Sequence, residues 1–149
     1  MRTEYNIAIA GLQLISKADD IRSLGFKGAG KAIDGGVVAL NADSETCSAV
    51  VAGSKDFGVV VFHHIGKSGR TDDNKAEAYI AGDVPPVMVM GRVWVKPSEA
   101  ITEIGKAAKV YVNTTDGTLG KTADGNTEFI GAYWDKPTNS DGLAAVNLG

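Results

Sequence analysis

"AYIAGDVPPVMVMGRVWVKP", residues 78–97, decides the fold class. The Pro85–Pro86 pair fixes where a strand can begin, because proline lacks the backbone donor of a sheet ladder. Beyond it, the residues alternate as in a strand. One face collects valines and the other collects larger side chains. The valine face is Val87, Val89, Val93 and Val95, which we expect to be core. Gly91 interrupts this face and indicates a bulge or a close backbone contact.

The second face of this strand has an unusual composition. Methionine, arginine and tryptophan are enriched at protein interfaces. The candidate interface residues are therefore Met88, Met90, Arg92 and Trp94. The competing interpretation is a second core layer with Arg92 at its rim, since large apolar residues are most often buried.

The rest of the chain supports a β protein. Its 149 residues include 25 valines and isoleucines but only 7 leucines, and β-branched side chains favour strands. The 19 glycines are spread along the chain, as expected for many turns. Strand-like runs cover residues 35–41, 47–54, 57–65, 109–113, 127–135 and 143–149, and Asp116-Gly117 predicts a hairpin turn. Residues 57–65 are apolar on both faces, whereas residues 66–75 predict a surface loop. These patterns predict an all-β fold: an antiparallel β-sandwich, jelly-roll or barrel-like, with at most one or two short helices.

We interpret residues 1–149 as a single domain. Residues 1–34 are interpreted as an N-terminal arm and loop region, and residues 35–149 as the β-rich core. The apolar segment from Met1 to Leu14 has no obvious strand partner in this interpretation.

The net charge of −3, with mixed signs, gives no electrostatic reason to expect a nucleic-acid partner. No apolar run is long enough to predict a membrane span. The lone cysteine, Cys47, is expected to be a buried, inert hydrophobe.

"GFKGAGKAI", residues 25–33, has the glycine and lysine spacing of a phosphate-binding loop. Ala32 stands where the Mg²⁺-binding hydroxyl belongs, and the preceding residues are too polar for a buried strand. We therefore expect no nucleotide role for Lys31. The alternative is a short helix capped by Ser16 and ended by Gly25 in a left-handed conformation, with Phe26 folding back on Ile21.

No catalytic residue, metal ligand or cofactor is expected. His63 and His64 are adjacent, so on a strand they would point to opposite faces. The acidic pairs Asp19-Asp20 and Asp72-Asp73 lack the further residues of a calcium loop. We find no zinc spacing and no nucleophile elbow.

From about residue 35 onward, the order of features resembles the small head decoration, or cement, proteins of tailed bacteriophages. The order is "GGVVAL", "FGVVVFHHI", "YIAGDVPPVMVMGRVWVKPSEAI", "KVYVN", "DGTLG", "FIGAYWD" and "GLAAVNLG". The resemblance implies a β-rich, non-enzymatic structural virion protein that forms homodimers or homotrimers. It implies synthesis in the host cytoplasm and binding to the outer surface of the assembled capsid, where copies bridge and stabilise neighbouring subunits of the major capsid protein. No cofactor, nucleic acid or membrane is implied.

A carbohydrate-binding module of a tail or cell-surface protein is the alternative function. A sugar site on a β-sandwich needs exposed aromatic side chains. The candidates are Trp94, Tyr111, Tyr133 and Trp134.

Overall fold

The computed structural model describes residues 9–14 and 19–149, which form two six-stranded sheets and a small hairpin. Sheet A has the order β1 (Gln13–Leu14), β10 (Arg92–Val95), β14 (Ala144–Asn147), β13 (Thr127–Lys136), β11 (Lys109–Val112) and β12 (Leu119–Gly120). Sheet B has the order β2 (Asp20–Ser23), β9 (Pro86–Met90), β6 (Phe57–Val60), β4 (Val37–Leu40), β5 (Thr46–Ala49) and β3 (Gly25–Phe26). The hairpin pairs β7 (Gly69–Arg70) with β8 (Glu77–Ala78).

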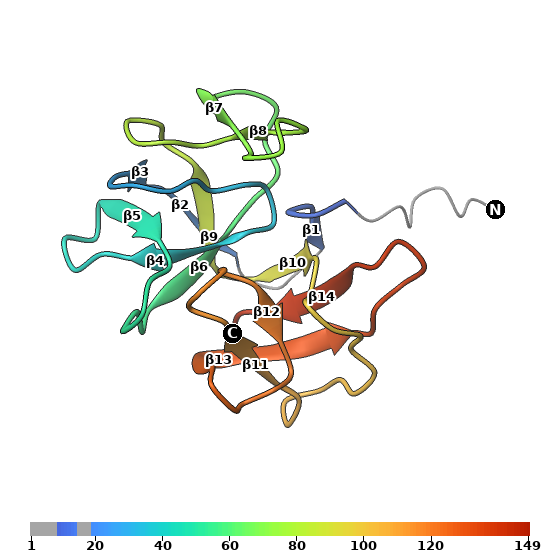
Figure 1. The fold of residues 1–149 in the computed structure, drawn as a ribbon. Helices are drawn as coiled ribbons and strands as arrows, with labels where there is room; N and C mark the ends of the chain where they lie inside the picture. The colour runs from blue at the N-terminus through green and yellow to red at the C-terminus, as the bar shows by residue number, and fades with distance from the viewer. Residues whose placement is uncertain (1–8, 15–18) are drawn as a thin grey trace.

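The all-β prediction is confirmed. Paired strands are antiparallel apart from β3 and β5, which run parallel. The described residues contain no helix, and so none that could cross a membrane. Strands β2 to β9 form one half of the molecule and β10 to β14 the other (Figure 1). Only β1 departs from this division, because it comes from the N-terminal end yet pairs with β10.

Sheet B curls on itself. Strands β2 and β3 occupy its opposite ends, yet only Leu24 separates them in the chain. A single residue cannot span a flat six-stranded sheet, because neighbouring strands lie about 4.8 Å apart. The inside of the curl is filled by one apolar cluster, which consists of Leu24, Phe26, Ala32, Val38, Cys47, Val60, Tyr79 and Val87.

The second and larger core lies between the two sheets. Sheet B contributes Phe57, Val59 and Met88, with Val37 and Val61 beside them. Sheet A contributes Val93, Val95, Val110, Val112, Phe129, Ala132, Trp134, Ala144 and Val146, among others. Strand β6 therefore faces both cores, Val59 on one side and Val60 on the other, as its continuous apolar run predicts. The strand ends at Val60, earlier than residue 65.

Gly91 is the point at which the chain leaves sheet B and enters sheet A. Strand β9 ends at Met90 and β10 begins at Arg92. The crossing reverses the alternation, so that Met88 faces the same core as Val93 and Val95. Val87 instead faces the interior of the curl, with the half-buried Val89. The expectation of one continuous valine face is therefore wrong, although Val87, Val93 and Val95 are all core residues.

The N-terminal region is more integrated than an arm and loop. Strand β1 pairs with β10, so the expectation that this segment lacks a strand partner is wrong for residues 13–14. Just before it, the Gly11 N–H donates to the Trp94 carbonyl (2.7 Å), and the Gly11 carbonyl accepts from the Phe62 N–H (2.8 Å). A Cβ on Gly11 would meet the Phe62 nitrogen at 2.7 Å, which explains the glycine. Residues 1–8 of the expected arm lie outside the described residues.

The helix expected before Gly25 is not formed. Asp20–Ser23 is a strand paired with β9, and Gly25 opens the next strand. The Asp20 and Arg22 side chains form an ion pair at 2.9 Å on this exposed edge. The proposed cap, Ser16, lies outside the described residues.

The expected surface loop at residues 66–75 contains β7 and is tied down by Asp83. The Asp83 carboxylate accepts from the Ser68 N–H (2.8 Å), the Ser68 hydroxyl (2.6 Å) and the Ile80 N–H (2.9 Å). These bonds, that from the Ser68 hydroxyl above all, hold the pKa of Asp83 below its ordinary value of 3.8. The Gly-Asp turn before the two prolines thus fixes the start of β9 and the neighbouring loop together.

Gly91→Ala should lower the free energy of unfolding by about 2–4 kcal/mol, because φ is +123° there and a Cβ would meet Sδ of the buried Met88 at 3.1 Å. Urea denaturation measures the loss. Gly53→Ala is the matched control, since Gly53 has φ +91° with no atom within 4 Å, and should cost about 1 kcal/mol. Equal losses would show that the crossing at Gly91 does not require close contact.

Asp83→Asn should lower the free energy of unfolding at neutral pH by about 1–2 kcal/mol, because charge-assisted hydrogen bonds are lost at a partly exposed site. The lowered pKa means that this stabilisation is present above pH 3.8 and is lost as the pH falls below it. The variant should therefore lose less stability than the wild type between about pH 5 and pH 2. Thermal melting across this range measures it, with Asp124→Asn in the exposed turn at residues 123–126 as the control. Parallel pH curves for Asp83→Asn and the wild type would contradict this account.

Candidate interaction surfaces

The four residues of the sequence-predicted interface do not share one surface. Met88 is fully buried in the core between the sheets, as the core-layer interpretation expects, whereas Met90 is 41% exposed at the end of β9. Arg92 and Trp94 lie on the outer face of sheet A, opposite the inward-facing Val93 and Val95. The crossing at Gly91 separates the two methionines from the other pair, and sequence alternation alone carries no sign of it.

Arg92 is anchored on the outer face of sheet A. Its Nε donates to Asp135 Oδ2 (2.7 Å) and its Nη2 completes an ion pair with the same oxygen (2.5 Å). Both side chains are about one-fifth exposed. The ion pair links β10 to β13 across the intervening strand β14, and so holds both side chains in place on the outer face.

Three half-buried aromatic side chains lie on this outer face, on strands β10, β13 and β11. Trp94 stands opposite Ala145 of β14, and Tyr133 is paired with both Asn147 and Lys109. Tyr111 alternates with the buried Val110 and Val112, and so points outward. The outer face therefore carries the aromatic trio Trp94, Tyr133 and Tyr111, between Arg92 and the Lys109–Glu128 ion pair (3.4 Å).

Trp134, the fourth aromatic candidate, lies in the core between the sheets and is fully buried. Trp134 therefore cannot contribute to a carbohydrate-binding surface, which needs exposed aromatic side chains. A cavity of about 240 Å³ lies beside it, lined by Ile101, Glu103, Ala107, Ala108, Lys109, Tyr111 and Lys121 as well as Trp134.

A bulge in β13 presents the most exposed large hydrophobic side chain of the described residues. The β11–β13 register passes from Lys109–Tyr133 to Tyr111–Glu128, so that β13 advances five residues while β11 advances two. Ile130, within this bulge, is 79% exposed, while Phe129 and Ala132 on either side are buried. Phe129 packs on Phe57 with ring centroids 5.5 Å apart. The sequence signal was the Ile130-Gly131 step, which the strand prediction passed over.

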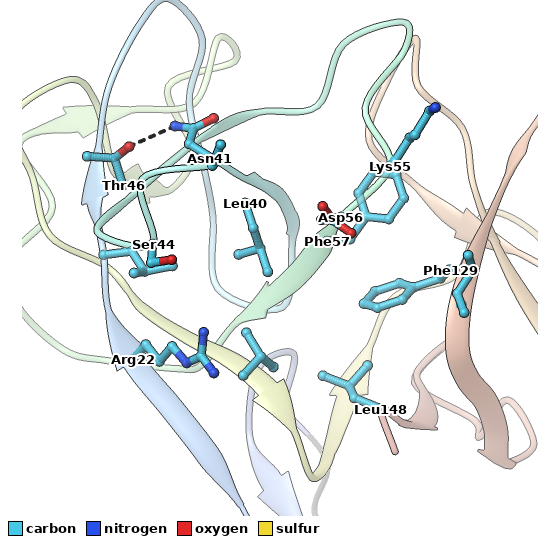
Figure 2. A pocket seen from close by; sticks show the side chains of 14 residues that line it. Arg22, Leu40, Asn41, Ser44, Thr46, Lys55, Asp56, Phe57, Phe129 and Leu148 are labelled. Atoms are coloured by element: carbon cyan, nitrogen blue, oxygen red, sulfur yellow. Dashed lines mark hydrogen bonds between the residues drawn. The ribbon is translucent and has the colours of Figure 1, made fainter.

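A pocket of about 400 Å³ adjoins this bulge, between sheet B and β13. Figure 2 shows Phe129 and Leu148 on one side of it, with Leu40 and Arg22 across from them. Its rim is polar, and the Asn41 amide donates to the Thr46 hydroxyl (2.9 Å). Its lining includes the charged side chains of Arg22, Lys55 and Asp56. Across residues 9–14 and 19–149, no group of three or more His, Cys, Asp and Glu residues could hold a metal ion.

Residues 30–33, the second half of the stretch at residues 25–33, line a wider groove of about 850 Å³, which is also bounded by the hairpin turn at Asp116 and Gly117. Lys31 is engaged there by the β7–β8 hairpin: its ammonium donates to Asp72 Oδ1 (3.0 Å) and to the Arg70 carbonyl. Lys31 therefore stabilises the turn of the β7–β8 hairpin.

The remaining reactive side chains have structural surroundings. His63 and His64 lie on an exposed loop, where the His64 ring meets Phe62 edge-on at 4.8 Å. Cys47 is fully buried, and burial raises the pKa of its thiol to about 11, so the expectation of a buried, inert cysteine fits its surroundings. Asp73 accepts from the Thr71 hydroxyl and the Lys75 N–H, which lowers its pKa.

Comparison with known proteins identifies the family. The family model described as structural cement protein (E217 gp24/Pam3 gp6) matches residues 1–149. The chain therefore belongs to the phage structural cement protein family, as the sequence resemblance indicated. Among solved structures, a chain of "The capsid of Myoviridae Phage XM1" superposes with a TM-score of 0.70 at 16% identity, over 95% of this chain and 89% of that one. No curated protein matches the sequence.

Proposed function

We propose that this protein binds the outer surface of an assembled phage capsid and stabilises the shell by bridging neighbouring major capsid subunits. Membership of the cement family over the whole chain carries the proposal. The likeness in fold to a chain of a phage capsid structure is compatible with it. In this role the protein acts as a homodimer or homotrimer on the virion, after synthesis in the host cytoplasm, and catalyses no reaction.

The physical basis of cementing is multivalent binding to one state of the partner. When one oligomer contacts several subunits, the second contact forms at a high effective concentration, provided that the subunit spacing fits. That spacing exists only in the assembled shell. Selective binding to the shell then stabilises it by mass action, whereas isolated subunits offer single weak contacts.

The outer face of sheet A is the contact surface that we propose. Tryptophan, tyrosine and arginine are the residue types most enriched at interface hot spots, and this face carries Trp94, Tyr133, Tyr111 and Arg92. A sheet face holds such side chains on a rigid frame, which lowers the entropy lost on binding. Met90 lies outside this face and Met88 is buried, so neither belongs to the proposed contact.

The purified protein should bind undecorated, expanded heads saturably and raise their melting temperature, while binding isolated major capsid subunits weakly. Counting bound copies by gel densitometry and melting the heads by differential scanning fluorimetry measures both effects. An absence of saturable binding, with capsid melting unchanged, would contradict the proposal.

Trp94→Ala should weaken capsid attachment at least tenfold, because truncating an interface tryptophan typically costs about 2 kcal/mol or more. Ile104→Ala is the matched control: Ile104 is 52% exposed but lies in the connection between β10 and β11, off the sheet face. Tyr133→Ala provides a second variant if Trp94→Ala melts below the wild type. If both aromatic variants fold and attach to capsids as tightly as the wild type, the outer face of sheet A is not the contact surface.

Carbohydrate binding remains a second candidate function, because the aromatic trio lies together on one partly exposed face. Sugar rings stack on such side chains through their apolar C–H faces. A glycan array with the wild type and Trp94→Ala separates the two candidates. A glycan bound only by the wild type, together with no binding to heads, would favour the carbohydrate function.

A further inference from the structure

The buried side chain of Lys67 forms an ion pair with Asp34. These two residues stand on either side of the chain segment that contains β4, β5 and β6. Asp34 lies in the turn before β4, and Lys67 lies in the loop after β6. The Lys67 side chain is 6% exposed and that of Asp34 is 18% exposed. Lys67 Nζ is 3.2 Å from Asp34 Oδ2 and also donates to the His63 carbonyl.

Two aromatic rings lie beside the lysine of this pair. Lys67 Nζ lies 5.3 Å from the ring centroid of Tyr79 and 6.0 Å from that of Phe62. Tyr79 is fully buried in the core of the curled sheet. Water, the usual competitor for a reactive carboxyl group, is therefore largely excluded from this side of the pair.

Two polar atoms at this place lack hydrogen-bond partners. Among the described residues, the buried side-chain atoms without a partner are Asp34 Oδ1, the Tyr79 hydroxyl and Trp134 Nε1. The first two belong to this cluster. Burial, and then the charges of Asp34 and Asp83, raise the pKa of Tyr79 to about 12, so its hydroxyl keeps its proton. A satisfied ion pair ordinarily leaves no such atoms in a native interior.

We propose that Lys67 and Asp34 form an intramolecular amide bond in the folded protein. In this condensation a proton first passes from Nζ to the carboxylate, which gives a neutral amine and a carboxylic acid. The Nζ lone pair then attacks Asp34 Cγ and a C–N bond forms. The Cγ–Oδ bond breaks as that oxygen takes up a second proton from the nitrogen and leaves as water. No oxidant, reductant or external reagent takes part.

The surroundings supply what this condensation needs. Lys67 Nζ lies 3.2 Å from Oδ2 of the carboxyl group that it would attack, so folding has already brought the two groups together. The Tyr79 hydroxyl is the donor that we assign to the carboxyl oxygen on which charge develops. The His63 carbonyl orients the amine.

The bond would join the entrance of β4 to the exit of β6, enclosing β4, β5 and β6 in one covalent ring. A cross-link of this kind stabilises mainly by restricting the unfolded chain. It would act whether or not the protein binds capsids, so its test is independent of the proposed function.

The test is the intact mass of the purified, denatured full-length protein. The wild type should weigh one water molecule less than its sequence requires, and Lys67→Arg should match its own sequence mass, because a guanidinium does not acylate under these conditions. Tandem mass spectrometry of a protease digest should yield a branched peptide that joins Lys67 to Asp34. A wild-type mass equal to that of the sequence would overturn the proposal and leave a non-covalent ion pair.

A cyclic imide at Asp34-Gly35 would also remove one water, and the variant separates the two. The mass deficit would persist in Lys67→Arg and no branched peptide would be found, which would likewise overturn the proposal. Tyr79→Phe keeps the ring but removes the hydroxyl, and should lower the cross-linked fraction several-fold. Complete cross-linking in Tyr79→Phe would overturn the role assigned to that hydroxyl.

Discussion

The passage of the chain from one sheet to the other at Gly91 is the constraint on which the rest of the structure depends. Strand β9 lies next to the edge strand β2 in the curled sheet and β10 belongs to the opposite sheet, so a single residue joins the two sheets here. The carbonyl of Gly91 also accepts from the Leu148 N–H (2.8 Å), which draws the last residues of the chain to the same point. Met88 before the crossing and Val93 after it both lie in the core between the sheets.

The arrangement divides the side chains into three environments: the interior of the curl, the core between the sheets, and the outer face of sheet A. Valines and small residues fill the first two together with large apolar side chains such as Phe57, Phe129 and Trp134, at the close packing of protein interiors. The half-buried aromatic side chains and the Arg92–Asp135 ion pair lie in the third. The candidate contact surface is therefore a product of the packing, since Trp94 and Tyr133 point outward because Val93 and Trp134 point inward.

Sequence reasoning predicted much of this where a pattern is local. The alternation on either side of Gly91 appears as expected. The runs expected at residues 57–65 and 109–113 form strands over Phe57–Val60 and Lys109–Val112. It failed where partners are distant. Asp20–Ser23 is a polar edge strand whose conformation is set by pairing with β9, and the sequence alone favoured a helix. The reversal at Gly91 depends on which sheet each strand joins, so alternation alone leaves Met88 open between an interface and a second core layer.

The segment around Gly11 gives the molecule a second connection between its halves, and this has a mechanical consequence. Its backbone is bonded to Trp94 in one sheet and to Phe62, which follows the central strand of the other. A force that pulls the halves apart is therefore shared between this segment and the covalent crossing at Gly91. The β1–β10 ladder pairs only two residues on each strand, so under such a force it is the element that we expect to yield first.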